Sequence, residues 1–228
     1  MILGWYFWRK FAVRFEISKS NKIMKPIHKA HPWHGIPIGD NAPEVVTTFI
    51  EIVPSDTIKY EIDKESGYLT IDRPQKYSNI VPALYGFIPQ TYCGDGVADY
   101  ARNRGVEKVK YGDGDPLDII VLSSHNIPHG DILLKARPIG GFCFLDKGEA
   151  DDKIIGVLVG DQIYGQYRDV SELPDAVMER VKHYFLTYKN LPGEPQHTEI
   201  AYEYGVQGAH EVIQQSVLDY RDLIFKPL

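Results

Sequence analysis

Residues 45–73, with the sequence VVTTFIEIVPSDTIKYEIDKESGYLTIDR, set the character of the fold. Three runs in this stretch, 45–53, 58–64 and 68–73, are rich in β-branched and aromatic residues. Proline, serine, aspartate and glycine separate the runs, and these residues favour turns. The stretch therefore predicts three consecutive β-strands joined by short connections.

Further strand-like runs lie toward the carboxyl end, at 117–123, 131–145 and 153–159. The long run at 131–145 contains Gly140-Gly141, and glycines inside a strand predict a bend or a β-bulge. Several short strands at regular spacing are typical of a closed barrel or a sandwich.

Two helices are expected after the strands. The first is predicted to begin near Ser171, a good N-terminal cap, and to end before Pro192-Gly193. The second is predicted at about 207–224. Residues 93–111, polar and mixed in charge, interrupt the strand pattern and are expected to form a loop insertion. The predicted fold class is α+β and mainly β, a barrel flanked by two helices.

The composition limits the possible functions. The chain has 228 residues, 43% of them hydrophobic, which is enough for the core of a single domain. Its net charge of −6 argues against general binding of nucleic acid, which depends on lysine and arginine. No apolar run approaches the length of a membrane span. Cys93 and Cys143 lack a metal-type spacing and are expected to be buried thiols in a reducing, cytoplasmic compartment.

Residues 1–23 differ from the rest of the chain because they are both aromatic and basic. They lack the longer apolar stretch of a secretory signal. Two interpretations stay open, a short helix on a membrane surface and an upstream extension with Met24 as the start of the functional chain. The second is favoured, so a single domain is expected over 24–228.

Residues 111–120 read YGDGDPLDII and place Asp113, Asp115 and Asp118 just before an apolar strand. Two unit charges about 4 Å apart repel by about 4 kcal/mol at an effective dielectric of about 20. A lone D-x-D would more often be a solvated turn, but matching parts elsewhere favour a site for a hard cation. An EF-hand would need glutamate at the twelfth loop position, which is Ser124 here. A set of oxygen ligands favours Mg²⁺, Mn²⁺ or Ca²⁺ over zinc.

Charged residues also interrupt other predicted elements. Glu51 breaks an apolar run, where a carboxylate is costly to bury unless it is paired or bound to a metal. Lys59 and Glu61 share one face of the next strand because alternate residues point the same way. Two more clusters follow along the chain: Asp146, Asp151 and Lys153 before a strand, and Tyr188-Lys189 at the end of the first predicted helix.

Several segments carry a family resemblance: 59–67 (KYEIDKESG), 81–86 (VPALYG), 112–118 (GDGDPLD), 136–140 (ARPIG) and 183–189 (HYFLTYK). In this order they resemble the soluble family I inorganic pyrophosphatases. The likeness covers about 30–225, and the lead-in AHPWH together with 93–111 is most similar to a bacterial subgroup that includes chlamydial enzymes. The resemblance implies a small closed five-stranded, OB-like barrel with flanking strands and two helices. It also implies Mg²⁺-dependent hydrolysis of pyrophosphate to two orthophosphates by a metal-activated water.

The resemblance implies roles for the acidic residues. Asp113, Asp118 and Asp151 match the ligands of the tightest metal, and Asp118 bridges to a second ion. Asp146 and Asp151 match ligands of a metal that arrives with the substrate. Glu51 matches the carboxylate that holds a fourth metal.

The remaining roles concern the substrate. Asp115 matches the acceptor of the proton from the attacking water, Glu61 an acidic neighbour and Tyr85 a pocket tyrosine. Many relatives have a tyrosine where this chain has Val81. The groups that match phosphate ligands are Lys59, Arg73, Lys153, Tyr188 and Lys189. The expected pocket holds seven acidic and four basic residues, so divalent cations would be needed to attract pyrophosphate.

Two alternatives stay open at this point. A similar metal site would serve a hydrolase of nucleotides or organic diphosphates, for which 93–111 would have to offer a slot for the base. A small barrel with exposed aromatic residues is also typical of OB-type oligonucleotide-binding modules, although the acidic composition disfavours this. The resemblance further implies a homo-oligomer, a hexamer in most bacterial cases, with His183 near a subunit contact.

Overall fold

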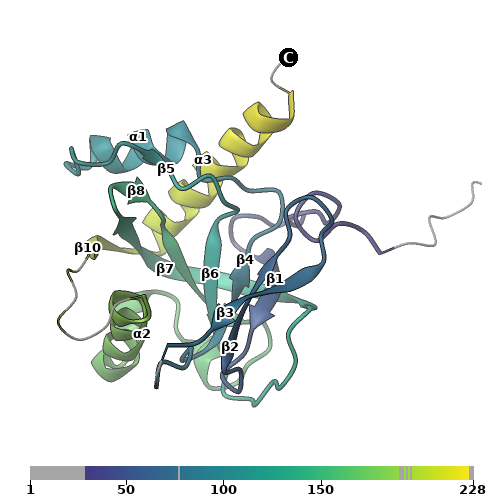
Figure 1. Ribbon diagram of the computed structural model, residues 1–228. Helices are drawn as coiled ribbons and strands as arrows, with labels where there is room; N and C mark the ends of the chain where they lie inside the picture. Colours follow the sequence, from purple (N-terminus) through teal and green to yellow (C-terminus); the bar gives the residue numbers. More distant parts are fainter. Residues whose placement is uncertain (1–28, 77, 190–192, 194, 196, 226–228) are drawn as a thin grey trace, which may run out of the picture.

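The computed structural model describes residues 29–76, 78–189, 193, 195 and 197–225 (Figure 1). The expectations for residues 1–23, for Met24 and for Pro192 lie outside the described residues. Within the described part, no helix has the length and apolar character that crossing a bilayer requires.

A closed ring of five strands forms the centre of the fold. Each strand pairs with the next, and the last strand pairs back onto the first. In spatial order the ring contains β1 (Val46–Ile52), β4 (Leu84–Phe87), β6 (Asp118–Leu122), β9 (Lys153–Leu158) and β7 (Ile132–Asp146). The ring confirms the OB-like barrel that was expected.

The longest strand, β7, closes the ring because it pairs with both β9 and β1. Its register shifts between Pro138 and Gly140, which agrees with the expected bend or β-bulge. Gly140 has a φ of +155°, and a Cβ there would lie 2.6 Å from the carbonyl oxygen of Tyr204. Only glycine allows this close approach of the neighbouring strand.

Other strands extend or accompany the ring. β10 (Thr198–Gly205) pairs along the second half of β7, and β5 (Tyr111–Gly112) and β8 (Glu149–Ala150) continue the same sheet. β2 (Ile58–Ile62) and β3 (Leu69–Pro74) form a separate two-stranded sheet. Neither β4 nor β10 was predicted, because β4 is short and β10 mixes polar with aromatic residues.

Three α-helices occur in the described residues, one more than predicted. The helices are α1 (Asp95–Asn103), α2 (Asp175–Thr187) and α3 (Val206–Phe225), with short 3₁₀ turns η1 (Tyr164–Gln166) and η2 (Val170–Glu172). α1 and α3 lie together at one end of the molecule, and α2 lies apart from them (Figure 1).

The additional helix corrects the expectation of a loop at 93–111. α1 buries Val97 and packs against α3. Asp219 of α3 accepts hydrogen bonds from the backbone N–H groups of Gly94 (3.0 Å) and Val97 (2.9 Å). Asp219 therefore caps the N-terminus of α1, although it lies 125 residues from Gly94 in the sequence. Local sequence does not reveal a cap that comes from such a distance.

α2 begins later than predicted. Ser171 lies in η2, where its N–H donates to Asp169 at 3.0 Å. Leu173 is extended (φ −72°, ψ 147°), as residues before proline prefer, so the helix starts only after Pro174.

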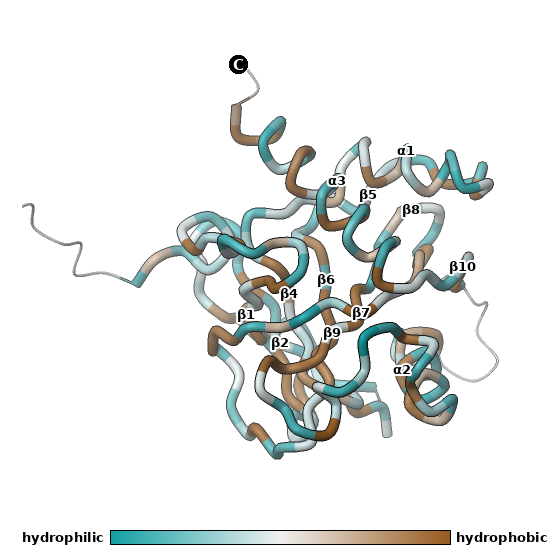
Figure 2. The backbone as a smooth tube through the Cα atoms, turned by 180° about the vertical axis from the view of Figure 1, so that it is seen from behind, coloured by the Kyte–Doolittle hydropathy of each residue, from teal (hydrophilic) through white to brown (hydrophobic). Residues whose placement is uncertain are grey.

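The hydrophobic core fills the ring and the space beneath the helices. Figure 2 shows hydrophobic stretches concentrated in ring strands such as β6 and β9, whereas the helices alternate in character. α2 packs the ring of Phe185 against Phe142 (centroids 5.7 Å apart) and Tyr85 (5.5 Å). This packing fixes the carboxyl end of α2 beside the strands that carry the charged residues.

Candidate active site

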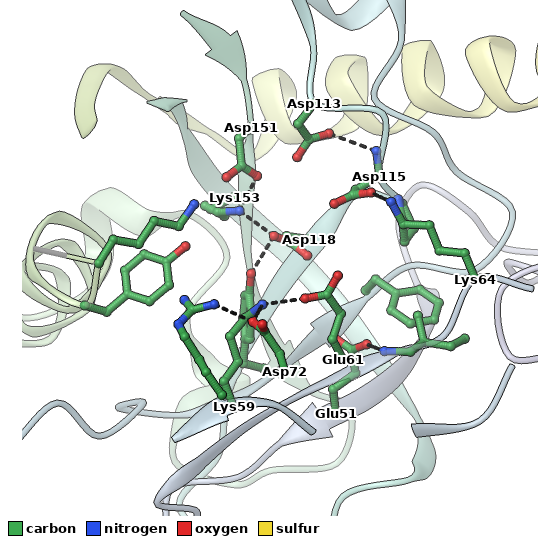
Figure 3. A pocket seen from close by; sticks show the side chains of 17 residues that line it. Glu51, Lys59, Glu61, Lys64, Asp72, Asp113, Asp115, Asp118, Asp151 and Lys153 are labelled. Carbon is green, nitrogen blue, oxygen red and sulfur yellow. Dashed lines mark hydrogen bonds and ion pairs between the residues drawn. The ribbon is translucent and has the colours of Figure 1, made fainter. Parts of the chain in front are cut away.

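One cleft gathers charged side chains from distant parts of the chain (Figure 3). Its cavity volume is about 330 Å³. Its acidic lining residues are Glu51, Glu61, Asp72, Asp113, Asp115, Asp118 and Asp151. Its basic lining residues are Lys59, Lys64, Arg73, Lys153 and Lys189. The remaining lining residues are Ile62, Tyr85, Phe87, Pro116 and Tyr188.

The cleft includes every site residue expected from sequence except Asp146. Asp146, at the end of β7, is not among the lining residues, but it accepts a hydrogen bond from Lys189 Nζ at 2.5 Å. Asp72 and Lys64 line the cleft although sequence analysis did not select them. Seven acidic and five basic residues give the lining a formal charge of −2.

Lys153 is a buried residue of the cleft lining. It begins β9 opposite Asp118, the first residue of β6, because the two strands pair in parallel. Its side chain is 2% exposed and forms ion pairs with both Asp118 and Asp151. Burial alone would lower the pKa of Lys153, but the two carboxylates outweigh it and raise that pKa. The Tyr85 hydroxyl donates a further hydrogen bond to Asp118.

The carboxylates around Lys153 are not fully neutralised. Burial, and next the negative charge of Asp151, raises the pKa of Asp113 well above its usual range. Burial also raises the pKa of Asp118, against the opposing effect of Lys153. By contrast, burial would raise the pKa of Asp151, but Lys153 and a hydrogen bond with Asp113 together outweigh it and lower that pKa. One ammonium is therefore too little positive charge for three neighbouring carboxylates.

Glu51 reaches the cleft from the middle of β1 and is only 6% exposed. Its carboxylate accepts a hydrogen bond from the backbone N–H of Ile62 at 2.7 Å. Burial raises its pKa to about 8, and the charges of Asp118 and Glu61 add to the effect. The cost of placing a carboxylate here agrees with the expectation drawn from the interrupted apolar run.

The β2–β3 sheet supplies one wall of the cleft. Lys59 and Arg73 are paired across the two strands, and a register shift follows Lys59. Lys59 Nζ donates to Glu61 (2.6 Å) and to Asp72 (2.8 Å), and Arg73 forms an ion pair with Asp72. Burial would lower the pKa of Lys59, but these two acceptors raise it. Asp72 therefore holds two basic side chains together.

The turn between β5 and β6 supplies the opposite rim. The N–H of Asp115 donates to the Asp113 carboxylate at 3.1 Å, which fixes the tight turn. Lys64, just beyond β2, forms an ion pair with Asp115. The side chains of Lys64 and Asp115 are 46% and 39% exposed, so this pair stands at the mouth of the cleft.

The end of α2 closes the third side. Tyr188 is buried, and the Arg73 guanidinium lies 5.9 Å from the centre of its ring. Burial raises the pKa of Tyr188, so its hydroxyl remains a donor at neutral pH. Val81 packs in the same apolar cluster as Tyr85 and Tyr188, and brings no hydroxyl to this wall.

The donor set fits a hard cation in its chemistry. Asp113, Asp118 and Asp151 offer only oxygen atoms, the ligands that Mg²⁺ and Ca²⁺ prefer. The raised pKa values of Asp113 and Asp118 show that added positive charge would be stabilising here. Among the described residues, no three His, Cys, Asp or Glu side chains are so arranged that they would hold an ion as they stand. The Lys153 ammonium lies between two of the carboxylates, so side-chain movement would accompany binding.

The two residues that sequence analysis did not select, Asp72 and Lys64, carry no local signal of their place in the cleft. Asp72 lies next to Arg73, and simple strand alternation would send the two side chains to opposite faces. The register shift after Lys59 brings both of them to Lys59 and the cleft. Lys64 follows the end of β2, so its direction depends on the turn rather than on alternation.

Comparison with known proteins gives consistent results. A family model described as inorganic pyrophosphatase matches residues 48–221. An inorganic pyrophosphatase from Chlamydia muridarum is 48% identical over 203 residues, which cover 87% of this chain and 97% of that protein. A soluble inorganic pyrophosphatase from Oryza sativa subsp. indica is 35% identical over 192 residues, covering 79% and 81%.

A solved structure supports the same likeness. The crystal structure of inorganic pyrophosphatase from Thermus thermophilus superposes with a TM-score of 0.70 at 28% identity. The superposition covers 85% of this chain and 99% of that one. The similarity therefore extends over the ring and the elements that surround it.

Proposed function

The chain belongs to the inorganic pyrophosphatase family, and we propose that the cleft between the β2–β3 sheet and the ring is its active site. The chain is accordingly a hydrolase that converts pyrophosphate to two orthophosphates. One observation carries the assignment of the cleft. Seven carboxylates and five cationic groups from six separate segments converge in one cavity, and a polyanionic substrate bound with divalent cations requires this combination.

The family implies a divalent metal cofactor, and we infer that Mg²⁺ is the ion used, with Mn²⁺ as a possible replacement. Asp113, Asp118 and Asp151 would hold the tightest ion, with Asp118 shared between two ions. Asp146 and Glu51 would hold further ions. When bound, divalent cations reverse the negative charge of the cleft and lower the pKa of coordinated water toward neutrality.

The basic wall would bind the two phosphate groups. The planar guanidinium of Arg73 matches two phosphate oxygens, and the lysines act as point charges near the leaving phosphate. Asp72 keeps Lys59 and Arg73 side by side, so their positive charges are positioned before the substrate arrives. The proposed phosphate ligands are Lys59, Arg73, Lys153, Tyr188 and Lys189.

Asp115 would accept the proton of the attacking water. Its side chain is 39% exposed at the mouth of the cleft, where water has access. Two residues would support the reaction from beside it. Glu61 accepts a hydrogen bond from Lys59, and Tyr85 donates one to Asp118.

Orthophosphate release from pyrophosphate tests this assignment. We expect release with Mg²⁺ and none with excess chelator. Asp118→Asn should lower turnover by about 100-fold or more while the protein stays folded, which circular dichroism would check. Near-normal turnover in that variant would refute the proposed role of Asp118. Nucleoside diphosphates in the same assay test the alternative substrate class.

The finer properties of the enzyme are also proposals. We propose a homo-oligomer, with a hexamer favoured, and light scattering in solution would measure its mass. His183 is exposed on α2, as a subunit contact would require. Cys93 and Cys143 are buried free thiols, which agrees with a cytoplasmic location.

A further inference from the structure

The carboxyl end of α2 lies at the active-site cleft, which Tyr188 and Lys189 line. The helix ends at Thr187, Tyr188 is its cap residue, and Lys189 follows. The last carbonyl groups of a helix lack partners within the helix and need donors from elsewhere. Two residues proposed to bind phosphate, Tyr188 and Lys189, directly follow the helix, so their placement is linked to how the carbonyl groups of Thr187 and Lys189 are held.

The donors come from the segment that follows β3. Lys76 Nζ donates to the carbonyl oxygen of Lys189 at 2.6 Å. Asn79 Nδ2 donates to the carbonyl oxygen of Thr187 at 3.3 Å, and Thr187 Oγ1 donates back to Asn79 Oδ1 at 3.3 Å. All of these contacts join segments more than 100 residues apart. The positive charge of Lys76 at a helix carboxyl end is also favourable to the helix dipole.

The same segment continues directly from Arg73. Arg73 ends the β2–β3 wall of the cleft, and its guanidinium lies over the ring of Tyr188. Only two residues separate Arg73 from Lys76, so the bond from Lys76 to the Lys189 carbonyl also links the two walls of the cleft.

We propose that Lys76 and Asn79 are positioning residues that hold Tyr188 and Lys189 at a fixed distance from Arg73. The inference rests on the proposed role of these three groups as phosphate ligands. Lys76 itself does not line the cavity, because its Nζ is bound to the backbone carbonyl of Lys189, just beyond the carboxyl end of α2. Its effect is therefore on the binding of substrate and product, through the placement of Lys189.

Three variants test the proposal. Lys76→Met removes the ammonium and keeps a side chain of similar length, Lys76→Arg restores a donor, and Asn79→Ala removes the second tie. Lys110→Met is the matched control, since Lys110 is an exposed lysine remote from these contacts. The measurements are KM and kcat for pyrophosphate, and the Kd of inorganic phosphate by calorimetry in the presence of Mg²⁺.

We expect Lys76→Met to raise KM and the phosphate Kd about fivefold, the scale of one lost hydrogen bond, with kcat changed by less than about twofold. Lys76→Arg should recover most of the affinity, Asn79→Ala should show a smaller rise, and Lys110→Met should match the wild type. An unchanged KM and Kd in Lys76→Met would overturn the proposal, and so would a fall in kcat alone. Thermal melting of each variant measures whether it is folded under the assay conditions, so that a loss of folded protein is not mistaken for a change in KM, Kd or kcat.

Lys189→Met separates this proposal from the one on which it rests. If Lys189→Met raises KM but Lys76→Met does not, only the positioning role is refuted. If Lys189→Met leaves KM unchanged, Lys189 is not a phosphate ligand and both proposals fail.

Discussion

Replacing Lys153 by methionine tests the electrostatic basis of the cleft. Lys153 Nζ is paired with Asp118 and Asp151, and the three side chains are 2%, 20% and 10% exposed. Methionine preserves most of the apolar stem, so the variant creates little empty space. It leaves two buried carboxylates without their cation, beside a third, Asp113, whose pKa is already raised.

Removing one partner of a buried ion pair costs about 3–5 kcal/mol because the remaining charge is left without compensation. Asp118 keeps some contact with solvent, so we expect the lower end of this range, about 3 kcal/mol. With a urea m-value of about 2–3 kcal/mol per molar, the unfolding midpoint should fall by about 1 M.

Urea unfolding in excess chelator, at one fixed protein concentration, measures the change. The matched control is Lys182→Met on α2, because Lys182 also makes two ion pairs, with Glu179 and Glu203. These partners are 70% and 44% exposed, so this variant should lose less than about 1 kcal/mol. Equal losses in the two variants would refute the claim that burial makes the Lys153 pairs strong.

Three further predictions concern stability and metal binding. Burial would raise the pKa of Asp161, but backbone N–H groups of Ser124, Ile163 and Tyr164 outweigh it and lower that pKa to about 2. A carboxyl pKa that is lower in the folded than in the unfolded protein stabilises the fold at pH values above the unfolded-state pKa. Asp161→Asn should therefore cost about 2 kcal/mol at pH 7 and progressively less as the pH falls below about 4. Thermal melting at pH 7 and pH 3 checks this. Asp219→Ala should cost about 1–2 kcal/mol and speed amide exchange in α1, because its N-terminal N–H groups lose their acceptor. Mg²⁺ should raise the melting temperature of the wild type, because a ligand that binds only the folded state stabilises that state. The rise should be smaller in Asp113→Asn, which lacks one of the proposed metal ligands.

Each of these predictions has an outcome that contradicts it. A constant difference between wild type and Asp161→Asn at both pH values would mean that the carboxylate charge is not what stabilises the turn. Unchanged exchange in α1 would show that Asp219 is not its cap. An identical Mg²⁺ response in Asp113→Asn would remove Asp113 from the proposed metal ligands.

The strands of the ring were largely predictable because the sequence signals for them are local. Runs such as 45–53 and 153–159 combine β-branched residues with turns at their ends, and the structure places β1 and β9 within them. The bend at Gly140 was also predictable, since paired glycines have few other uses inside a strand. β10 was not, because its polar and aromatic residues are suited to a strand only beside β7.

Helix α1 shows where local reading fails. Its first N–H groups are satisfied by Asp219, so the signal for its start lies in another helix. Sequence analysis missed Asp72 for a related reason. Its place beside Lys59 depends on the pairing of β2 with β3 and on a shifted register, neither of which a single strand records.

The amino-acid sequence by itself determined which chemical groups this enzyme possesses. A cluster of aspartates at 113–118, separate basic residues and the family motifs follow from residue identity and order, which are local properties. Only the tertiary structure decided which of these groups meet. It set Lys153 between two carboxylates, paired Asp146 with Lys189 and bonded Lys76 to the Lys189 carbonyl just beyond α2. Electrostatic and hydrogen-bond energies depend on separation in space and on burial, and the folded chain fixes both.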